Sequence, residues 1–211
     1  MARDDARKVI VPLTSGNFHR SCIMAFRRDH WSKGSSIAVL HREDVTPLQR
    51  PLKQSFAIRR ATVADCAAIL ECLLTAFAPY RESYTPEAFS DTVLSPDTFR
   101  HRLSDMSVVV ATSTAGEVVG TVAYKALKSG EGHLRGMAVK PEWHGSGLST
   151  SLLKTAEDEL SKAGCKTITV DTTDPLNRAI RFYERNGFRP TGKIGWFFGM
   201  PLIEFRKPIG G

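Results

Sequence analysis

The sequence is poor in cysteine and has no long apolar run, and each absence excludes a class of protein. Its four cysteines among 211 residues show no Cys-x-x-Cys spacing, which favours a chain with free thiols in a reducing compartment. No apolar run approaches the roughly 20 residues that a membrane-spanning helix needs. The first residues carry Asp4 and Asp5 among basic residues and contain no apolar core, so we expect no secretory signal. We therefore expect a cytoplasmic protein that does not enter a membrane.

Two common phosphate-binding signatures are missing from the most distinctive stretch of the chain, residues 134–153 (LRGMAVKPEWHGSGLSTSLL). No Lys-Ser or Lys-Thr pair follows Gly147, which excludes a P-loop, and Thr150 stands where a dinucleotide fingerprint needs its third glycine. The stretch instead indicates a buried strand stopped by Pro141, a glycine turn, and a helix with leucines at helical spacing. A helix that begins in a glycine loop directs unpaired N–H groups and partial positive charge at one point. The stretch therefore predicts an anion site, most naturally for phosphate.

The positive charge of the chain is concentrated near its N-terminus. The formal net charge is +7, and residues 1–55 hold ten Lys/Arg against five Asp/Glu. We divide the chain into a basic, poorly ordered N-terminal extension (residues 1–54) and a folded domain (residues 55–211). A basic tail can bind nucleic acid, but this one lacks interleaved aromatic residues and a reading helix, so we expect no nucleic-acid partner. No metal is expected either, because the potential ligands in the extension fit no zinc spacing; they are His19, Cys22, His30 and His41.

The domain alternates strand-like and helix-like segments, which predicts an α/β fold with a sheet of mixed direction, in the order β-α-α-β-β-β-α-β-α-β-β. Strands are expected at residues 55–59, 108–112, 118–124, 133–139, 167–172, 192–198 and 200–205. Helices are expected at residues 62–77 and 148–164, with short pieces at 86–89 and 98–103. A last helix is expected to start at the N-cap Asp174 with Pro175 in its first position, and to end at Gly187.

Two signatures follow each other in this domain. They are Val139-x-Pro141-x-x-His144-Gly145-x-Gly147-Leu148-Ser149 and Asn177-x-Ala179-x-x-Phe182-Tyr183-x-x-x-Gly187-Phe188. In this order they resemble the GNAT superfamily of acyl-CoA-dependent N-acetyltransferases, over residues 55–207. The family pattern has Gln or Arg where His144 stands, and Gly or Ala where Ser149 stands. The resemblance implies a GNAT-type mixed, mostly antiparallel β-sheet flanked by helices, with acetyl-CoA as co-substrate.

The resemblance also implies which residues hold the CoA. The main chain of Met137, Ala138 and Val139 would pair with the pantetheine arm, at a place where the sheet splays before residues 167–172. The amide of Asn177 would contact pantetheine, and Tyr183 would lie beside the CoA sulfur. The backbone N–H groups that would hold the pyrophosphate are those of His144, Gly145, Ser146, Gly147, Leu148, Ser149 and Thr150.

The implied reaction is transfer of an acetyl group from acetyl-CoA to a primary amine by direct attack on the thioester. An amine with a pKa near 10.4 must lose a proton first, at a cost of roughly 4–5 kcal/mol at pH 7. The candidates for this base are His133, then Glu131, then a water chain. His133 is expected to share a face with Arg135, Met137 and Val139. Tyr183 would donate a proton to the departing thiolate.

The acceptor itself is not specified by these residues. Tyr80, Arg81 and Tyr84 crowd into the connection after the first helix and are candidate substrate-binding residues. The acceptor is expected to be a small-molecule or peptide amine, with antibiotic, polyamine, amino acid and protein terminus all open, as is a homodimer. The rival hypothesis is a non-catalytic acyl-CoA-binding sensor or regulatory domain, against which Asn177 and Tyr183 argue.

Overall fold

The computed structural model describes residues 54–210, which belong to one compact unit, Gln49–Gly211. The predicted extension therefore lies outside the described residues except for Gln54, as do the four potential metal ligands within it. The strands are β1 (Phe56–Arg60), β2 (Ser107–Ser113), β3 (Val118–Ala126), β4 (Glu131–Val139), β5 (Thr167–Thr172), β6 (Arg189–Phe197) and β7 (Met200–Pro208). The α-helices are α1 (Cys66–Phe77), α2 (Pro86–Val93), α3 (Pro96–Asp105), α4 (Leu148–Lys162) and α5 (Asn177–Arg185). Short 3₁₀ turns are η1 (Val63–Asp65), η2 (Ala78–Ser83) and η3 (Pro141–Trp143).

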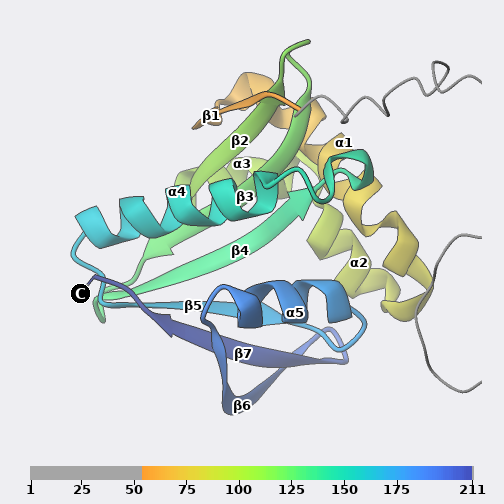
Figure 1. Ribbon diagram of the computed structural model, residues 1–211. Coiled ribbons are helices and arrows are strands. Elements are labelled where there is room, and N and C mark those ends of the chain that lie inside the picture. Colours follow the sequence, from red (N-terminus) through yellow and green to blue (C-terminus); the bar gives the residue numbers. More distant parts are fainter. Residues whose placement is uncertain (1–53, 211) are drawn as a thin grey trace, which may run out of the picture. The chain divides into compact units, whose positions relative to one another are not determined.

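The strands form one seven-stranded sheet in the order β1-β2-β3-β4-β5-β7-β6. Only the central pair β4–β5 is parallel, and every other neighbouring pair is antiparallel. Helices α4 and α5 cover one face of the sheet, and α1, α2 and α3 cover the other (Figure 1). The predicted mixed, mostly antiparallel sheet flanked by helices is confirmed.

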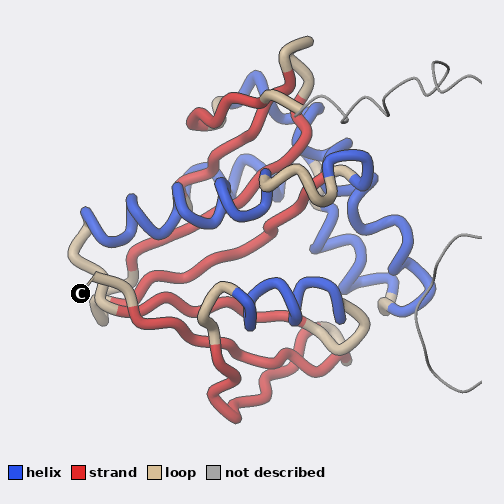
Figure 2. Tube along the Cα trace, in the orientation of Figure 1, coloured by secondary structure: helices blue, strands red, loops and turns tan. Residues whose placement is uncertain are grey.

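Strands β4 and β5 separate half-way along their length, as the resemblance to the GNAT superfamily implied. Their register covers only Glu131–Leu134 of β4 and Thr167–Val170 of β5, with Leu134 opposite Val170. Beyond this point β4 separates from β5 and runs to the segment that leads into α4 (Figure 2). Because a sheet that splits leaves backbone groups and side chains uncovered between its halves, a ligand can enter there.

A bulge in β4 overturns one prediction about the faces of this strand. Gly136 and Met137 together oppose the single residue Val122, and Gly136 has a φ of +61° that favours glycine. The extra residue reverses the alternation, so Met137 packs in the core under α4 and α5, whereas Arg135 bonds Asp91 of α2 on the other face. His133 therefore does not share a face with Met137, contrary to the strict alternation that we assumed.

The helices also differ from the prediction at two places. Three α-helices stand between β1 and β2, one more than the predicted order counts. The short pieces expected at residues 86–89 and 98–103 form separate, longer helices α2 and α3, because Leu94 has a φ of +64° and Ser95 caps α3. Helix α5 begins at Asn177 rather than after Asp174, because Asp174 lies in a turn that the bond from Leu176 N–H to Thr173 C=O closes. The predicted end of α5 is confirmed: Gly187 has a φ of +90°, and Phe188 N–H bonds Tyr183 C=O.

One helical segment is longer and more apolar than expected. Residues Val63–Ser83 run through η1, α1 and η2, contain an 18-residue window with a mean hydropathy of 1.5, and by length and composition alone could cross a membrane. Asp65 and Glu71 interrupt this segment, so it is not the uninterrupted apolar run that we expected to be absent. Four side chains of α1 are buried against the sheet: Ile69, Cys72, Leu73 and Phe77. The absence of a membrane role stays a prediction.

Candidate active site

A cavity of about 670 Å³ occupies the split between β4 and β5. Its walls come from β4, from the loop before α4, from the end of β5, and from α5 on one side of the sheet. On the other side they come from α1, α2, α3 and the turn η2. The cavity therefore opens toward both faces, and two molecules can meet in it from opposite sides.

Several backbone N–H groups of the loop before α4 have no hydrogen-bond acceptor among the described residues. Among residues 54–210, the N–H groups of Gly145, Gly147, Ser149 and Thr150 form no hydrogen bond, and these four residues line the cavity. The alternate N–H groups are satisfied: those of His144 and Ser146 bond Pro141 C=O and Trp143 C=O, and that of Leu148 bonds Ser146 Oγ. The N–H groups available to a ligand are thus fewer than the predicted run from His144 to Thr150, and they lie at the N-terminus of α4.

The two glycines and one histidine shape this loop. Gly145 and Gly147 have φ values of +85° and +88°, which L side chains rarely adopt. His144 bonds Val139 C=O through Nε2 at 3.0 Å, so its ring donates this proton and ties the loop to the end of β4. The side chain of His144 therefore holds the loop in place.

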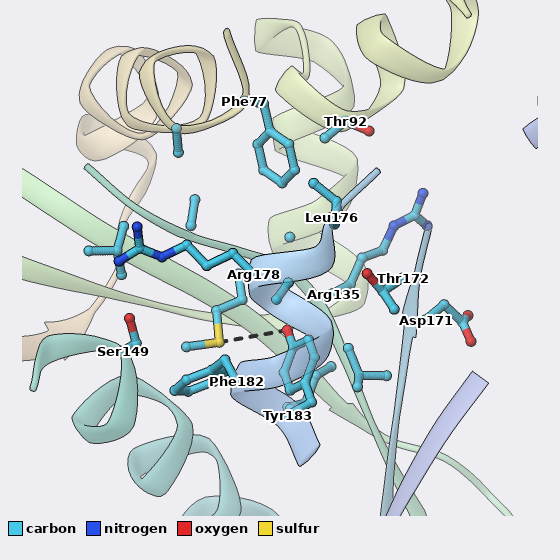
Figure 3. Close-up of a pocket in the computed structure, with 18 of the residues that line it drawn as sticks. Phe77, Thr92, Arg135, Ser149, Asp171, Thr172, Leu176, Arg178, Phe182 and Tyr183 are labelled. Carbon is cyan, nitrogen blue, oxygen red and sulfur yellow. Dashed lines mark hydrogen bonds between the residues drawn. The ribbon is translucent and has the colours of Figure 1, made fainter. Parts of the chain in front are cut away.

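Tyr183 lies at the floor of the cavity, on the face covered by α5. It is 5% exposed, and its hydroxyl contacts the sulfur of Met137 at 3.8 Å (Figure 3). Burial raises the pKa of this phenol, because an ionised oxygen there would lose its hydration. The hydroxyl therefore keeps its proton at neutral pH.

His133 lies on the opposite face of the split with two polar neighbours. Its Nδ1 is 3.1 Å from Thr169 Oγ1, and its Nε2 is 4.0 Å from Asp171 Oδ2. Burial raises the pKa of Asp171, and the neighbouring His133 opposes this rise. The other candidate base, Glu131, does not line the cavity, because it pairs with Arg206 at 2.7 Å.

The acceptor side of the cavity is walled by η2 and by the tip of the β6–β7 hairpin. Tyr80 and Tyr84, two of the candidate substrate-binding residues, line the cavity, and the Tyr84 hydroxyl is 3.1 Å from Thr173 Oγ1. Thr85 donates a hydrogen bond to Phe198 C=O at 2.8 Å, which joins the end of η2 to the hairpin. Arg81 does not line the cavity: its guanidinium lies 5.1 Å from the ring of Phe89.

Several predicted residues stay outside the cavity, and several unpredicted ones line it. Asn177 is exposed and does not line the cavity, Leu148 is fully buried in the core, and Ser146 bonds Trp143 C=O. Asp171 and Thr173 could have been foreseen, because the ends of adjacent parallel strands meet at one edge. The sequence offers no local signal for the other polar residues that the cavity adds, which are Asp91, Thr92, Arg102, Arg135, Thr172, Arg178 and Arg185.

The charged side chains divide between the two ends of the cavity. Arg178 extends on the side of Ser149, near the unpaired N–H groups (Figure 3). Arg135 and Asp171 lie on the opposite side of the view, where Arg135 bonds Asp91 at 2.7 Å. One end is therefore suited to phosphate, and the other end carries both signs of charge.

Comparison with known proteins identifies the architecture. Residues 69–188 match the model of the acetyltransferase (GNAT) family. The chain belongs to the GNAT family. It is 29% identical, over 69% of its length and 93% of the relative's, to the aminoglycoside N(6′)-acetyltransferase type 1 of Stenotrophomonas maltophilia.

Solved GNAT structures share the fold. The PaiA N-acetyltransferase from Thermoplasma acidophilum, in complex with coenzyme A, has a TM-score of 0.62 and 18% identity, over 73% of this chain and 99% of that one. The ribosomal-protein-S18-alanine N-acetyltransferase from Escherichia coli has a TM-score of 0.60 and 21% identity, and the match covers 74% of this chain and 96% of that one. This GNAT protein is an acyltransferase that uses acetyl-CoA and transfers the acetyl group to an amine.

Proposed function

We propose that this GNAT enzyme acetylates the primary amine of a small molecule within one cavity that holds donor and acceptor together. The observation that carries the proposal is the position of the split: the unpaired N–H groups of the loop lie at one end, and Tyr84, His133 and Asp171 lie at the other. The relative from Stenotrophomonas maltophilia is named for an aminoglycoside acceptor, which favours a small-molecule amine over a protein terminus.

On the donor side, the N–H groups of Gly145, Gly147, Ser149 and Thr150 would bind the CoA pyrophosphate, and Arg178 would add a positive charge. The backbone of β4 between Gly136 and Val139 has no partner strand on the side of the split, so it can pair with the pantetheine arm. The acetyl carbon would then lie between Tyr183 on one face and His133 on the other. Asn177 would take part only through a movement of α5, since it is exposed.

His133 is the base that the geometry favours. Thr169 Oγ1 donates its single proton to Gly132 C=O at 3.3 Å, so it accepts from His133 Nδ1–H. This assignment leaves the lone pair of Nε2 free to take the proton of the amine. The carboxylate of Asp171, 4.0 Å from Nε2, would stabilise the imidazolium that forms.

The transfer then needs two events. The nitrogen of the neutral amine forms a bond to the acetyl carbon while the carbon–sulfur bond breaks, and the nitrogen loses its second proton to solvent water. The thiolate of CoA accepts the proton of the Tyr183 hydroxyl, which solvent later replaces. A sensor that only holds acyl-CoA would have no use for either proton-transfer group, and the GNAT relatives do not favour it.

The test is thiol release from acetyl-CoA with a panel of amines: aminoglycosides, polyamines, amino acids and short peptides. Amine-dependent turnover is expected, and tight acetyl-CoA binding with no turnover for any amine would favour the sensor. The variant His133→Ala should shift the acidic limb of the kcat/KM profile to higher pH, because the amine must then lose its proton without help. An unchanged profile would show that a water chain, and not His133, takes the proton of the amine.

The cellular setting remains part of the proposal. Cys66, Cys72 and Cys165 are free thiols, which supports a reducing, cytoplasmic location. Among residues 54–210, no three His, Cys, Asp or Glu side chains gather as metal ligands would. A reaction without metal, without nucleic acid and without a membrane stays a prediction, and so does a homodimer.

A further inference from the structure

Arg102 is an arginine of the cavity wall that the proposed transfer does not use. It is the only arginine among residues 54–210 that is not largely exposed to solvent. Its guanidinium forms neither a hydrogen bond nor an ion pair with any described residue. Its neighbour on the same helix, Arg100, has both, since it bonds Asp97 at 2.6 Å. A half-buried guanidinium with five unused donors is costly unless an anion joins it.

The position of Arg102 is defined by the bulge in β4. A Cβ atom on Gly136 would lie 2.6 Å from Arg102 Nη1, so the guanidinium lies directly against this glycine. Gly136 is therefore suited both to the bulge and to the close approach of the arginine. This places the charge on the face of α2 and α3, at the point of β4 where acetyl transfer would take place.

The nearby protein charges do not neutralise Arg102. The carboxylate of Asp91 is engaged by Arg135 at 2.7 Å, and that of Asp171 lies beside His133. The pKa of Arg102 is lowered to about 10, mainly by burial and then by the positive charge of Arg135, while Asp91 acts in the opposite direction. Two arginines thus lie near one carboxylate that pairs with Arg135 alone, which leaves the positive charge of Arg102 for a ligand to meet.

The CoA is a poor source of this anion. Its phosphates would lie at the loop that starts beyond Val139, at least three residues along β4 from Gly136, or roughly 10 Å at about 3.3 Å per residue. The pantetheine arm and the thioester between them carry no charge. The anion must therefore come with the acceptor.

We infer that the acceptor of this enzyme carries a carboxylate next to its amine, as an amino acid does, and that Arg102 binds this carboxylate. The inference rests on the proposed function and names its substrate class. A guanidinium binds a carboxylate through two parallel hydrogen bonds, and this geometry fixes the direction of the amine. A polycation such as an aminoglycoside meets like charge here, so the acceptor differs in kind from that of the named relative.

The first experiment compares the amino acids with their primary amides, which keep the amine and the size but lose the negative charge. Thiol release should give a kcat/KM at least tenfold higher for the preferred amino acid than for its amide. Arg102→Met should abolish this preference by raising KM for the acid alone, Arg102→Lys should restore part of it, and Arg181→Met on the exposed side of α5 should leave it intact. An equal fall of kcat for acid and amide in Arg102→Met would instead assign Arg102 to the thioester and overturn the inference.

A second readout needs no turnover. N-acetylglycine and N-acetylglycinamide mimic the two products, and calorimetry should show at least tenfold tighter binding of the acid to the CoA-bound protein, with the difference lost in Arg102→Met. Equal affinities, or faster turnover of aminoglycosides or polyamines than of any amino acid, would overturn the inference while leaving acetyl transfer intact. No thiol release with any amine would overturn the proposed function, and the binding comparison would still decide the role of Arg102.

Discussion

At the scale of single residues, the surroundings of Tyr183 limit what its hydroxyl can do. The side chain packs against Phe182 and Phe188, with ring centroids 5.5 and 5.4 Å away, and its oxygen reaches only the sulfur of Met137. Because burial raises its pKa, the phenol is protonated throughout the neutral range and can give a proton but cannot take one. A general acid for the thiolate is the role that fits this state.

Tyr183→Phe keeps the ring and its packing and removes only this proton. A thiol with a pKa near 8.5 is a fair leaving group, so the loss should lower kcat by about 10²–10³-fold rather than abolish turnover. The affinity for acetyl-CoA should change little, as expected for an interaction that strengthens in the transition state. The measurement is kcat and KM across pH 6 to 9, with Tyr84→Phe as a control that should change mainly the KM of the amine. If Tyr183→Phe turned over at the parent rate while the chemical step is rate-limiting, Tyr183 would be a packing residue and not a general acid.

At the scale of elements, one carboxylate connects β1 to the start of α1. Asp65 accepts two bonds from Arg59, at 2.8 and 2.6 Å, and two from Thr62, one from its N–H and one from its hydroxyl. The Arg59 guanidinium, followed by the bonds from Thr62, holds the pKa of Asp65 well below its usual range, although burial acts the other way. This contact orients α1, whose last turn forms part of the cavity wall.

Asp65→Asn should therefore lower the free energy of unfolding by about 1.5–3 kcal/mol at pH 7. Since the folded pKa lies below the unfolded value near 3.9, the stabilisation is present above about pH 4 and is lost as the pH falls toward the folded pKa. Urea unfolding of both proteins from pH 7 to 2.5 should show the difference shrinking in acid. As a control, Asp97→Asn removes an exposed ion pair with Arg100 and should lower the free energy of unfolding by less than about 1 kcal/mol. If the difference between Asp65→Asn and the parent did not change with pH, the variant would have lost packing and not charge.

The loop before α4 offers a matched pair of glycines. Gly147 and Gly116 have φ values of +88° and +84°, and a Cβ atom on either would meet nothing within 4 Å. Valine at either position strains the backbone alike, but only Gly147 supplies an N–H group to the cavity. Gly147→Val should weaken acetyl-CoA binding at least tenfold, or about 1.4 kcal/mol, in a folded protein, and Gly116→Val in the β2–β3 hairpin should not. Equal calorimetric affinities in the two variants would remove the phosphate role from this loop.

At the scale of the whole molecule, the described residues carry a complete sheet with a buried core on each face. Most of the net charge lies before residue 56. Deleting residues 1–50 should therefore leave a domain that unfolds cooperatively and binds acetyl-CoA with parent-like affinity. Calorimetric melting and titration of the truncated protein check this. Loss of the cooperative transition would show that the extension contributes to the core.

The sequence by itself determined what depends on neighbours along the chain. The alternation of residues 167–172 predicted β5 to the residue, and Asn186-Gly187 predicted the end of α5, because side-chain periodicity and a left-handed glycine are local properties. The glycine loop predicted an anion site for the same reason, since unpaired N–H groups follow from any helix start. The order of these motifs was enough to identify the family.

The tertiary structure decided which side chains meet. The bulge at Gly136 placed His133 and Met137 on opposite faces, and no local pattern announces it, because the mismatch exists only against Val122 of β3. Glu131 forms an ion pair with Arg206 of β7. Arg102 of α3 lies against Gly136 of β4, which is 34 positions further along the chain. Ion pairs and desolvation depend on atoms brought together by folding, so the direction of a pKa shift and the sign of charge offered to an acceptor exist only once the sheet and its helices have formed.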